Sequence, residues 1–166
     1  MSISDTGSAQ RQTVFSSHAN PEDNLVAARV TATLQSAGYL VWCDLQDATP
    51  DDDIWAAIAH VLSNEAVKCV SLISTESVCK DGVKKEFELS HRLRRTMNDP
   101  GFIIPVRVDD VDFWNMPHGL GRHWVADAFE LGLDPALEEL CKALGKSGVP
   151  KAGSPSAQIP SVRPPP

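Results

Sequence analysis

Apolar residues along the chain fall into two patterns, short continuous runs and runs with helical spacing. Residues 39–43 form a nearly continuous apolar run, which is expected of a strand buried on both faces. Before this run, Val26, Val30 and Leu34 lie four residues apart, so they share one side of a helix that Gly38 ends. The two patterns alternate along the chain, which predicts a parallel sheet covered by helices.

Five strands and four helices are expected in this alternation. The first helix is predicted to take Asn20 as its N-cap and Pro21 as its first helical residue. Pro105 interrupts the fourth strand, and a distortion is expected there because proline cannot donate a ladder hydrogen bond. The strands are predicted over residues 14–16, 39–43, 68–74, 102–108 and 123–129, and the helices over residues 21–37, 51–62, 82–97 and 133–144.

The chain has the length of one domain, with polar segments at both ends. Residues 1–11 are rich in Ser, Gly and Gln and are expected to be a disordered lead-in. Residues 147–166 carry six of the twelve prolines and are expected to be a linker or tail, because proline with Ser, Gly and Ala cannot build a core. This tail suits a spacer to a further segment, and a natural end is the alternative. The folded unit is predicted over residues 12–146.

The composition is ordinary for a globular protein, with 42% hydrophobic and 22% charged residues. A formal net charge of −7 does not suit an independent binder of nucleic acid or of an anionic membrane. No apolar run approaches the roughly 20 residues of a spanning helix, and residues 1–10 lack the apolar centre of a secretory signal. The four cysteines show neither zinc-site nor disulfide spacing. We therefore expect a cytoplasmic protein without a metal or a cofactor.

In open parallel sheets, ligands bind beyond the carboxyl ends of the strands. In this chain those ends correspond to residues 16–18, 44–53 and 74–86. No dinucleotide G-x-G-x-x-G motif or P-loop is present, and a phospho-receiver domain would need acids where this chain has serines. Adjacent residues of an extended segment point to opposite sides, so Ser17 and His18 are not expected to pair as nucleophile and base.

Segments in order along the chain resemble the signature segments of TIR domains. The resemblance extends over about residues 12–145 and includes the proline of the fourth strand. It implies a flavodoxin-like α/β fold, with a five-stranded, mainly parallel sheet and helices on both faces. In NAD-cleaving TIR domains, the segment that matches residues 82–87 carries the catalytic glutamate, which here is Glu86. The other segments are residues 14–19 with 21–23, residues 40–44, residues 74–77 and residues 102–106.

Cleavage of the bond between nicotinamide and ribose suits a carboxylate such as that of Glu86. Nicotinamide leaves as a neutral molecule, so little acid catalysis is needed at the leaving group. A carboxylate near the ribose can hold its hydroxyls and stabilise the positive charge that develops on the sugar, as in glycosidases. A nearby helix N-terminus is expected to favour the ionised form of Glu86. The alternative is that Glu86 is only a favourable charge in the first turn of a helix.

The resemblance also implies contacts with NAD⁺, which is expected as a substrate rather than a cofactor. The serines and the histidine suit donors to phosphate or ribose, with turn capping as the alternative. The aromatic residues suit stacking on the nicotinamide or adenine ring, with core packing as the alternative. Asp44 suits a ribose contact or a loop cap. The candidate substrate-binding residues are Phe15, Ser16, Ser17, His18, Asp44, Trp55, Ser74 and Ser77.

Within the family, Cys43-Asp44, Ile54-Trp55 and the Gly-Val before Lys85-Glu86 are most similar to bacterial TIR domains fused to an APAZ region. Those subunits pair with short prokaryotic Argonautes in antiviral defence. The resemblance thus implies self-assembly with other TIR domains and an Argonaute/APAZ partner, without direct nucleic-acid contact. The chain departs from many enzymatic members in its longer turn over residues 80–83 and in residues 49–51, where a glycine is common.

The expected function is therefore that of an NAD⁺ nucleosidase, an effector of bacterial antiviral defence that TIR assembly activates. A non-catalytic module that signals through TIR–TIR contacts is the alternative. The sequence does not distinguish release of ADP-ribose from release of a cyclised form, because both products share the first bond cleavage.

Overall fold

The computed structural model of the protein describes residues 11–43, 52–112 and 126–151. A five-stranded sheet forms its centre, with the strand order β2-β1-β3-β4-β5 and every neighbouring pair parallel. The strands are β1 (Thr13–Ser17), β2 (Leu40–Cys43), β3 (Ala66–Ile73), β4 (Ile103–Arg107) and β5 (Ala126–Asp127). The helices are α2 (Asn24–Ser36), α3 (Asp52–Asn64), α4 (Asp81–Thr96), α5 (Ala128–Leu131) and α6 (Leu133–Lys146), with the 3-10 turn η1 (Ser77–Cys79) between β3 and α4.

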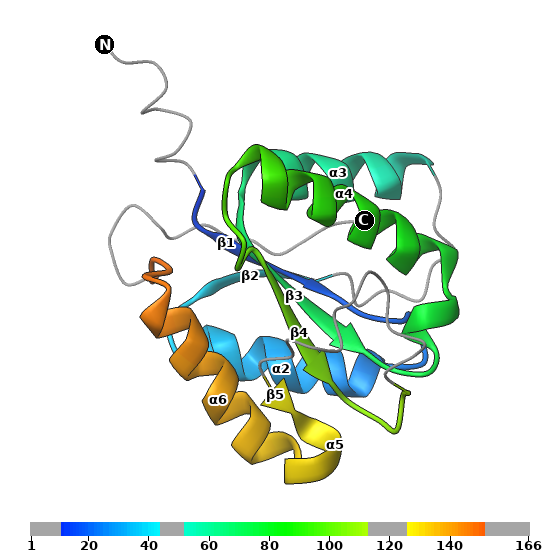
Figure 1. The fold of residues 1–166 in the computed structure, drawn as a ribbon, viewed down its shortest axis with the longest axis vertical. Coiled ribbons are helices and arrows are strands. Elements are labelled where there is room, and N and C mark those ends of the chain that lie inside the picture. Colours follow the sequence, from blue (N-terminus) through cyan, green and yellow to red (C-terminus); the bar gives the residue numbers. More distant parts are fainter. Residues whose placement is uncertain (1–10, 44–51, 113–125, 152–166) are drawn as a thin grey trace.

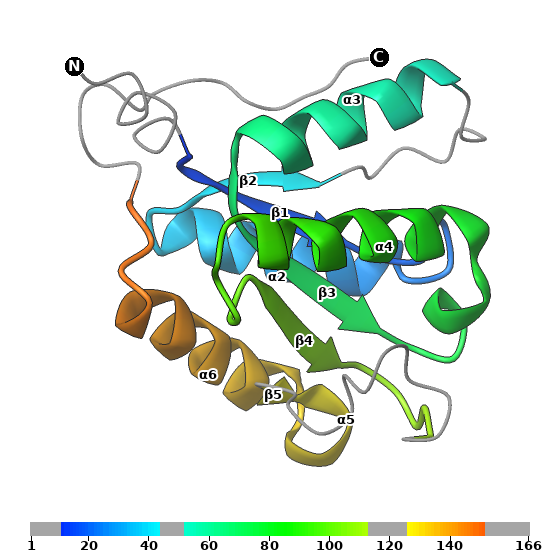
Figure 2. The same ribbon diagram turned by 45° about the horizontal axis from the view of Figure 1, so that its top comes forward.

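Helices cover both faces of this sheet. Helices α3 and α4 lie on one face, and α2 and α6 lie on the other (Figures 1 and 2). The sequence-based prediction of a flavodoxin-like α/β fold is thereby confirmed. Within the described residues, no helix combines the length and the apolar character that crossing a membrane requires.

Two apolar cores, one on each face, hold the helices to the sheet. Strand β3 serves both, because successive side chains of a strand point to opposite faces. Val70 and Leu72 belong to the core shared with α2 and α6, whereas Cys69 and Ile73 belong to the core shared with α3 and α4. Strand β3 is buried along almost its whole length, as expected of a central strand.

Helix α2 begins later than predicted. Asn20 and Pro21 do not start the helix but form a turn, in which the backbone N–H of Asp23 donates to the carbonyl of Ala19 and that of Asn24 to the carbonyl of Pro21. Asp23 occupies the N-cap position but makes no capping hydrogen bond with its side chain. The prediction of Asn20 as the N-cap was wrong. Local capping preferences take no account of tertiary contacts, and the Asp23 side chain has such a contact with Ser74.

Strand β2 lies at the edge of the sheet and is not buried on both faces as predicted. Its only strand neighbour among the described residues is β1, and Leu40, Trp42 and Cys43 are half-buried. A continuous apolar run indicates burial but does not say whether the strand is central.

Pro105 is accommodated in β4 without the expected distortion. The register with β3 is continuous, and Pro105 lies opposite Ser71. Among the described residues, strand β5 pairs with β4 only at Val106 and Arg107, so β3 is the one strand seen beside Pro105 in that part of the chain. A proline is tolerated where its missing donor faces no neighbouring strand.

Residues just before and just after the predicted unit 12–146 also contact the folded domain. The guanidinium of Arg11 donates to the carbonyl of Ala66 over 2.6 Å and to those of Leu62 and Ser63 at the end of α3. Beyond α6, Val149 is buried in the core shared with α2. Lys151 places its Nζ 5.4 Å from the centre of the Tyr39 ring. Residues 1–10 and 152–166, in the predicted lead-in and tail, lie outside the described residues.

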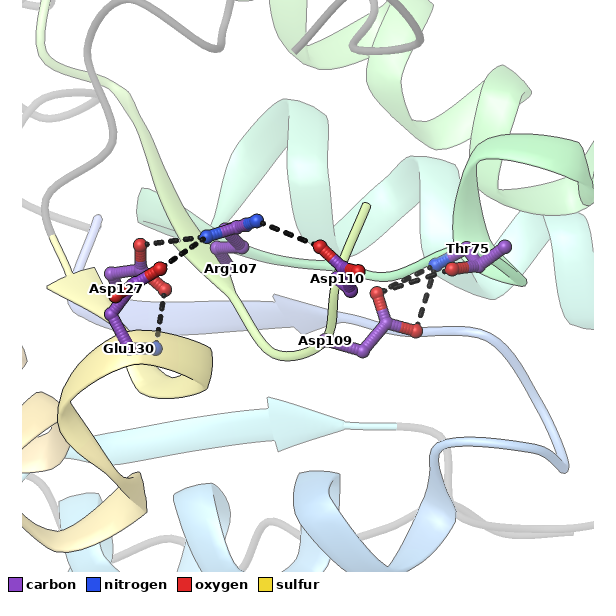
Figure 3. A network of polar contacts seen from close by, with 6 residues as sticks. All are labelled: Thr75, Arg107, Asp109, Asp110, Asp127 and Glu130. Atoms are coloured by element: carbon purple, nitrogen blue, oxygen red, sulfur yellow. Dashed lines mark hydrogen bonds and ion pairs between the residues drawn. The ribbon is translucent and has the colours of Figure 1, made fainter. Parts of the chain in front are cut away.

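The short strand β5 is attached to β4 by an ion-pair network (Figure 3). Arg107 Nη1 donates to Asp127 Oδ2 over 3.0 Å, and the two side chains are 12% and 17% exposed. Asp127 also accepts from the backbone N–H of Glu130 and so caps α5. This cap ends the strand at residue 127, two residues before its predicted end, and residues 123–125 of the prediction lie outside the described residues.

Loss of the Arg107 guanidinium should therefore destabilise the fold. We expect Arg107→Met to lower the free energy of unfolding by roughly 1–3 kcal/mol, because Asp127 would keep a largely buried charge without its partner. Urea unfolding measures the change. Arg29→Met is the matched control, since Arg29 and its partner Asp134 are 56% and 81% exposed and an exposed pair contributes about 0–1 kcal/mol. Equal losses in the two variants would contradict the prediction.

Candidate active site

Glu86 lies at the carboxyl edge of the sheet, where β1 ends. The Ser17 hydroxyl donates to Glu86 Oε1 over 2.6 Å. Ser17 is the last residue of β1 and is only 4% exposed, while Glu86 is half-buried on α4. A hydrogen bond to a carboxylate is short and strong, so this contact holds one side of the Glu86 carboxylate in place.

Glu86 belongs to the second turn of α4 rather than its first. The helix begins at Asp81, five residues earlier, and the influence of a helix dipole falls off within the first turn. The predicted contribution of the helix N-terminus to Glu86 is therefore small. The bond from Ser17 is the closer interaction with the carboxylate.

A second polar group lies at the same edge around His18, which is 6% exposed. Its Nε2 is 2.6 Å from Asn24 Oδ1, and its Nδ1 is 3.7 Å from Cys43 Sγ. Ser16 faces Cys43 directly in the β1–β2 register. The Ser16 hydroxyl is buried and has no hydrogen-bond partner among the described residues.

Ser74 and Ser77 build the turn that leads from β3 to α4. Both are buried, and each accepts from the other's backbone N–H through its hydroxyl, over 2.8 Å to Ser77 Oγ and 3.0 Å to Ser74 Oγ. The Ser74 hydroxyl also donates to Asp23 Oδ2 over 2.5 Å. The two hydroxyls thus form their hydrogen bonds within the protein. The turn that they stabilise leads into α4 and so helps to position Glu86.

The two candidate aromatic residues differ in placement. Phe15 is 1% exposed and stacks on Trp42, with ring centres 5.2 Å apart, so its ring packs in the core. Trp55 is half-buried on α3, and Lys85 Nζ lies 5.4 Å from the centre of its ring. Asp44, the remaining candidate, lies outside the described residues.

Burial shapes the acid–base behaviour of this edge. Burial is the main cause that raises the pKa of Asp23. The hydrogen bond from Ser74 and the charge of His18 act in the opposite direction, while Asp109 adds to the increase. Cys69, buried in the core shared with α3 and α4, has a pKa raised to about 12, chiefly by burial and in part by the Glu86 charge.

Four residues at this edge were not among the predicted site residues, namely Asp23, Asn24, Cys43 and Asp109. Asp109 accepts from the backbone N–H of Thr75 over 3.0 Å (Figure 3). The link joins the loop after β4 to the loop after β3, and no local pattern marks it in the sequence. In the part of the chain that the structure describes, no three His, Cys, Asp or Glu side chains gather to hold a metal ion.

Comparison with known families agrees with this architecture. The model of the TIR domain family matches residues 14–141, so the chain belongs to the TIR domain family. No curated protein shows a significant sequence match to it.

Two solved structures show the same fold at low sequence identity. The TIR domains in the structure of the activated Roq1 resistosome directly recognizing the pathogen effector XopQ superpose with a TM-score of 0.60 at 12% identity, over 80% of this chain and 99% of that one. A metazoan TIR-STING receptor from C. gigas in complex with 2′,3′-cGAMP superposes with a TM-score of 0.57 at 16% identity. That match covers 76% of this chain and 38% of the receptor chain.

The raised pKa of Asp23 predicts a specific pH dependence. In the pH range between its ordinary value near 3.8 and its raised folded-state value, the folded protein binds more protons than the unfolded protein. The contribution of Asp23 to stability therefore decreases as the pH rises through this window. Asp23→Asn removes the titration and keeps an acceptor for Ser74. We expect the stability of this variant relative to wild type to increase as the pH rises from about 3.8 through this window.

Urea unfolding of both proteins across that range measures the difference, in which the titration of the other carboxylates cancels. A difference that stayed constant, or that decreased with pH, would contradict the assignment.

Proposed function

We propose that this TIR domain hydrolyses the bond between nicotinamide and ribose in NAD⁺, with Glu86 as the catalytic carboxylate. The observation that carries the proposal is the 2.6 Å hydrogen bond from Ser17 to Glu86 at the carboxyl edge of the sheet. This edge is where open parallel sheets bind their ligands. Glu86 also occupies the position that matches the catalytic glutamate of NAD-cleaving TIR domains.

The chemistry asks little of the protein beyond a well-placed negative charge. As the C–N bond to the ribose breaks, nicotinamide takes the bonding pair and leaves as a neutral molecule. The ribose carbon gains oxocarbenium character, and a carboxylate beside the sugar stabilises this charge. Water then adds to that carbon and releases a proton, so that the products are ADP-ribose, nicotinamide and H⁺.

The remaining site residues divide by their placement. Trp55, half-buried on α3, is the aromatic side chain we assign to stacking on the nicotinamide or adenine ring, and Asp44 remains a proposed ribose contact. Ser17 acts through Glu86 as a positioning residue. Ser74 and Ser77 act through the turn that leads into α4.

The setting we propose is bacterial antiviral defence in the cytoplasm. Activity would arise when TIR domains assemble and a loop of one copy completes the site of the next. The Roq1 structure, of an activated resistosome with its TIR domains, offers a precedent for assembly in this fold. The similarity of residues 43–44, 54–55 and 82–86 to TIR–APAZ subunits supports a short Argonaute partner, which would sense the nucleic acid.

The decisive test compares Glu86→Gln with wild type during incubation with NAD⁺ under forced clustering. We expect Glu86→Gln to lower nicotinamide release by roughly 10²–10³-fold or more, because the amide cannot stabilise the cationic sugar. Glu88→Gln is the matched control, since it makes the same change in charge on the same helix at an exposed position and should retain activity. Chromatography of the products separates ADP-ribose from a cyclised form.

Unchanged turnover by a folded Glu86→Gln protein would remove the catalytic assignment. Absence of turnover in clustered wild type, with signalling that survives Glu86→Gln, would favour the non-catalytic scaffold.

Ser17 provides a second test of the same site. Ser17→Ala removes the donor to Glu86 and is expected to lower kcat by about tenfold with little change in KM, because the carboxylate loses its orientation rather than its charge. Ser17→Thr keeps the hydroxyl and should restore most of the activity. Steady-state kinetics of the clustered proteins measures both. A rise in KM alone would instead assign Ser17 to substrate binding.

A further inference from the structure

Cys43, His18 and Asn24 form a polar cluster that is separate from the Ser17–Glu86 pair. Ser17 contacts α4, on the side of the sheet where Phe15 is buried. His18 contacts Asn24 of α2, on the opposite side. Two adjacent residues at the end of β1 thus serve two different groups, as the alternation of side chains requires.

Two hydrogen bonds of this cluster indicate which nitrogen of His18 carries the proton. Asn24 Nδ2 donates to Asn20 Oδ1 over 3.3 Å, which directs Asn24 Oδ1 toward the imidazole. A carbonyl oxygen only accepts, so His18 Nε2 carries the proton of that 2.6 Å bond. In the neutral imidazole the lone pair is then on Nδ1, 3.7 Å from Cys43 Sγ. The ring therefore presents a proton acceptor to the thiol.

This arrangement has the order of an activated nucleophile, with a thiol, a base and a group that orients the base. We infer that Cys43 is a modification site that reacts with carbon electrophiles of the α,β-unsaturated carbonyl class. The sulfur attacks the β-carbon, an S–C bond forms and the C=C π bond breaks. The thiol proton passes to His18 Nδ1 and then to the α-carbon, so that His18 returns to its neutral form.

Two neighbouring groups support this chemistry. Asp23 precedes Asn24, and its carboxylate interacts electrostatically with His18, which offsets part of the cost of a buried imidazolium. The buried Ser16 hydroxyl lies opposite Cys43 in the strand register and has no hydrogen-bond partner among the described residues. In the inferred reaction, Ser16 is assigned as the donor to the carbonyl oxygen, on which negative charge develops during the addition.

The other three cysteines serve as internal references. Cys69 is fully buried, and Cys141 is half-buried, with burial raising the pKa of each thiol. Both should stay unmodified while the protein is folded. Cys79 is exposed in η1 and represents an accessible thiol.

The experiment treats the full chain at pH 7 with less than one equivalent of N-ethylmaleimide and quantifies each modified cysteine by peptide mass spectrometry. Because an ordinary thiol is only a few per cent thiolate at this pH, a base beside it can raise the rate substantially. We expect Cys43 to react before the more exposed Cys79. His18→Gln should lower the modification rate of Cys43 about tenfold and leave the modification rate of Cys79 unchanged.

Asn24 is tested as the positioning residue. Asn24→Ala removes the acceptor that orients His18 and should slow Cys43, whereas Asn24→Asp keeps an oxygen there and should restore the rate. A purely structural role predicts the opposite direction, since loosening of the fold exposes thiols and speeds their modification. If a variant unfolds, modification of Cys69 and Cys141 reveals it. The inference is then tested by the modification rates of Cys43 and Cys79 in the wild-type protein.

Two results overturn the inference. One is a wild-type Cys43 that reacts no faster than Cys79. The other is an unchanged Cys43 rate in folded His18→Gln or Asn24→Ala protein. Either result leaves the NAD⁺ proposal intact, because that proposal is tested by nicotinamide release in Glu86→Gln, whereas this inference is tested by the modification rate of Cys43.

Discussion

The parallel pairing of β1 with both of its neighbours is the constraint on which the candidate site depends. Ser16 lies opposite Cys43 of β2 and Val70 of β3, and Ser17 lies opposite Ser71. Because all the strands run in the same direction, their carboxyl ends meet at one edge, and the polar residues that follow them are brought together. The alternation of side chains then sends Ser17 to one face and His18 to the other.

The position of Glu86 depends on this edge as well as on its own helix. Strand β3 ends in the turn that Ser74 and Ser77 build, and this turn leads through η1 into α4. The bond from Ser74 to Asp23 ties the same turn to the start of α2. The position of Glu86 therefore depends on its bond from Ser17 and on the turn that Ser74 ties to α2. Glu88, two residues further along α4, is exposed.

Buried polar groups at this edge carry a cost that a purely structural fold would avoid. Asp23 is kept partly buried with a raised pKa, and the Ser16 hydroxyl has no hydrogen-bond partner among the described residues. Burial of polar groups with incomplete hydrogen bonding destabilises a fold. Such groups concentrate at binding and catalytic sites, which agrees with a functional role for this edge.

The layered α/β architecture and the polar residues at the strand ends could be predicted from the sequence, because hydrophobic periodicity acts over a few residues. The edge position of β2, the start of α2 at Asn24 and the contacts between polar groups became apparent only in the folded chain. Ser17 and Glu86 are 69 residues apart, and Asp23 and Ser74 are 51 apart. Such contacts follow from the order of the strands in the sheet, which depends on pairing between segments far apart in the sequence.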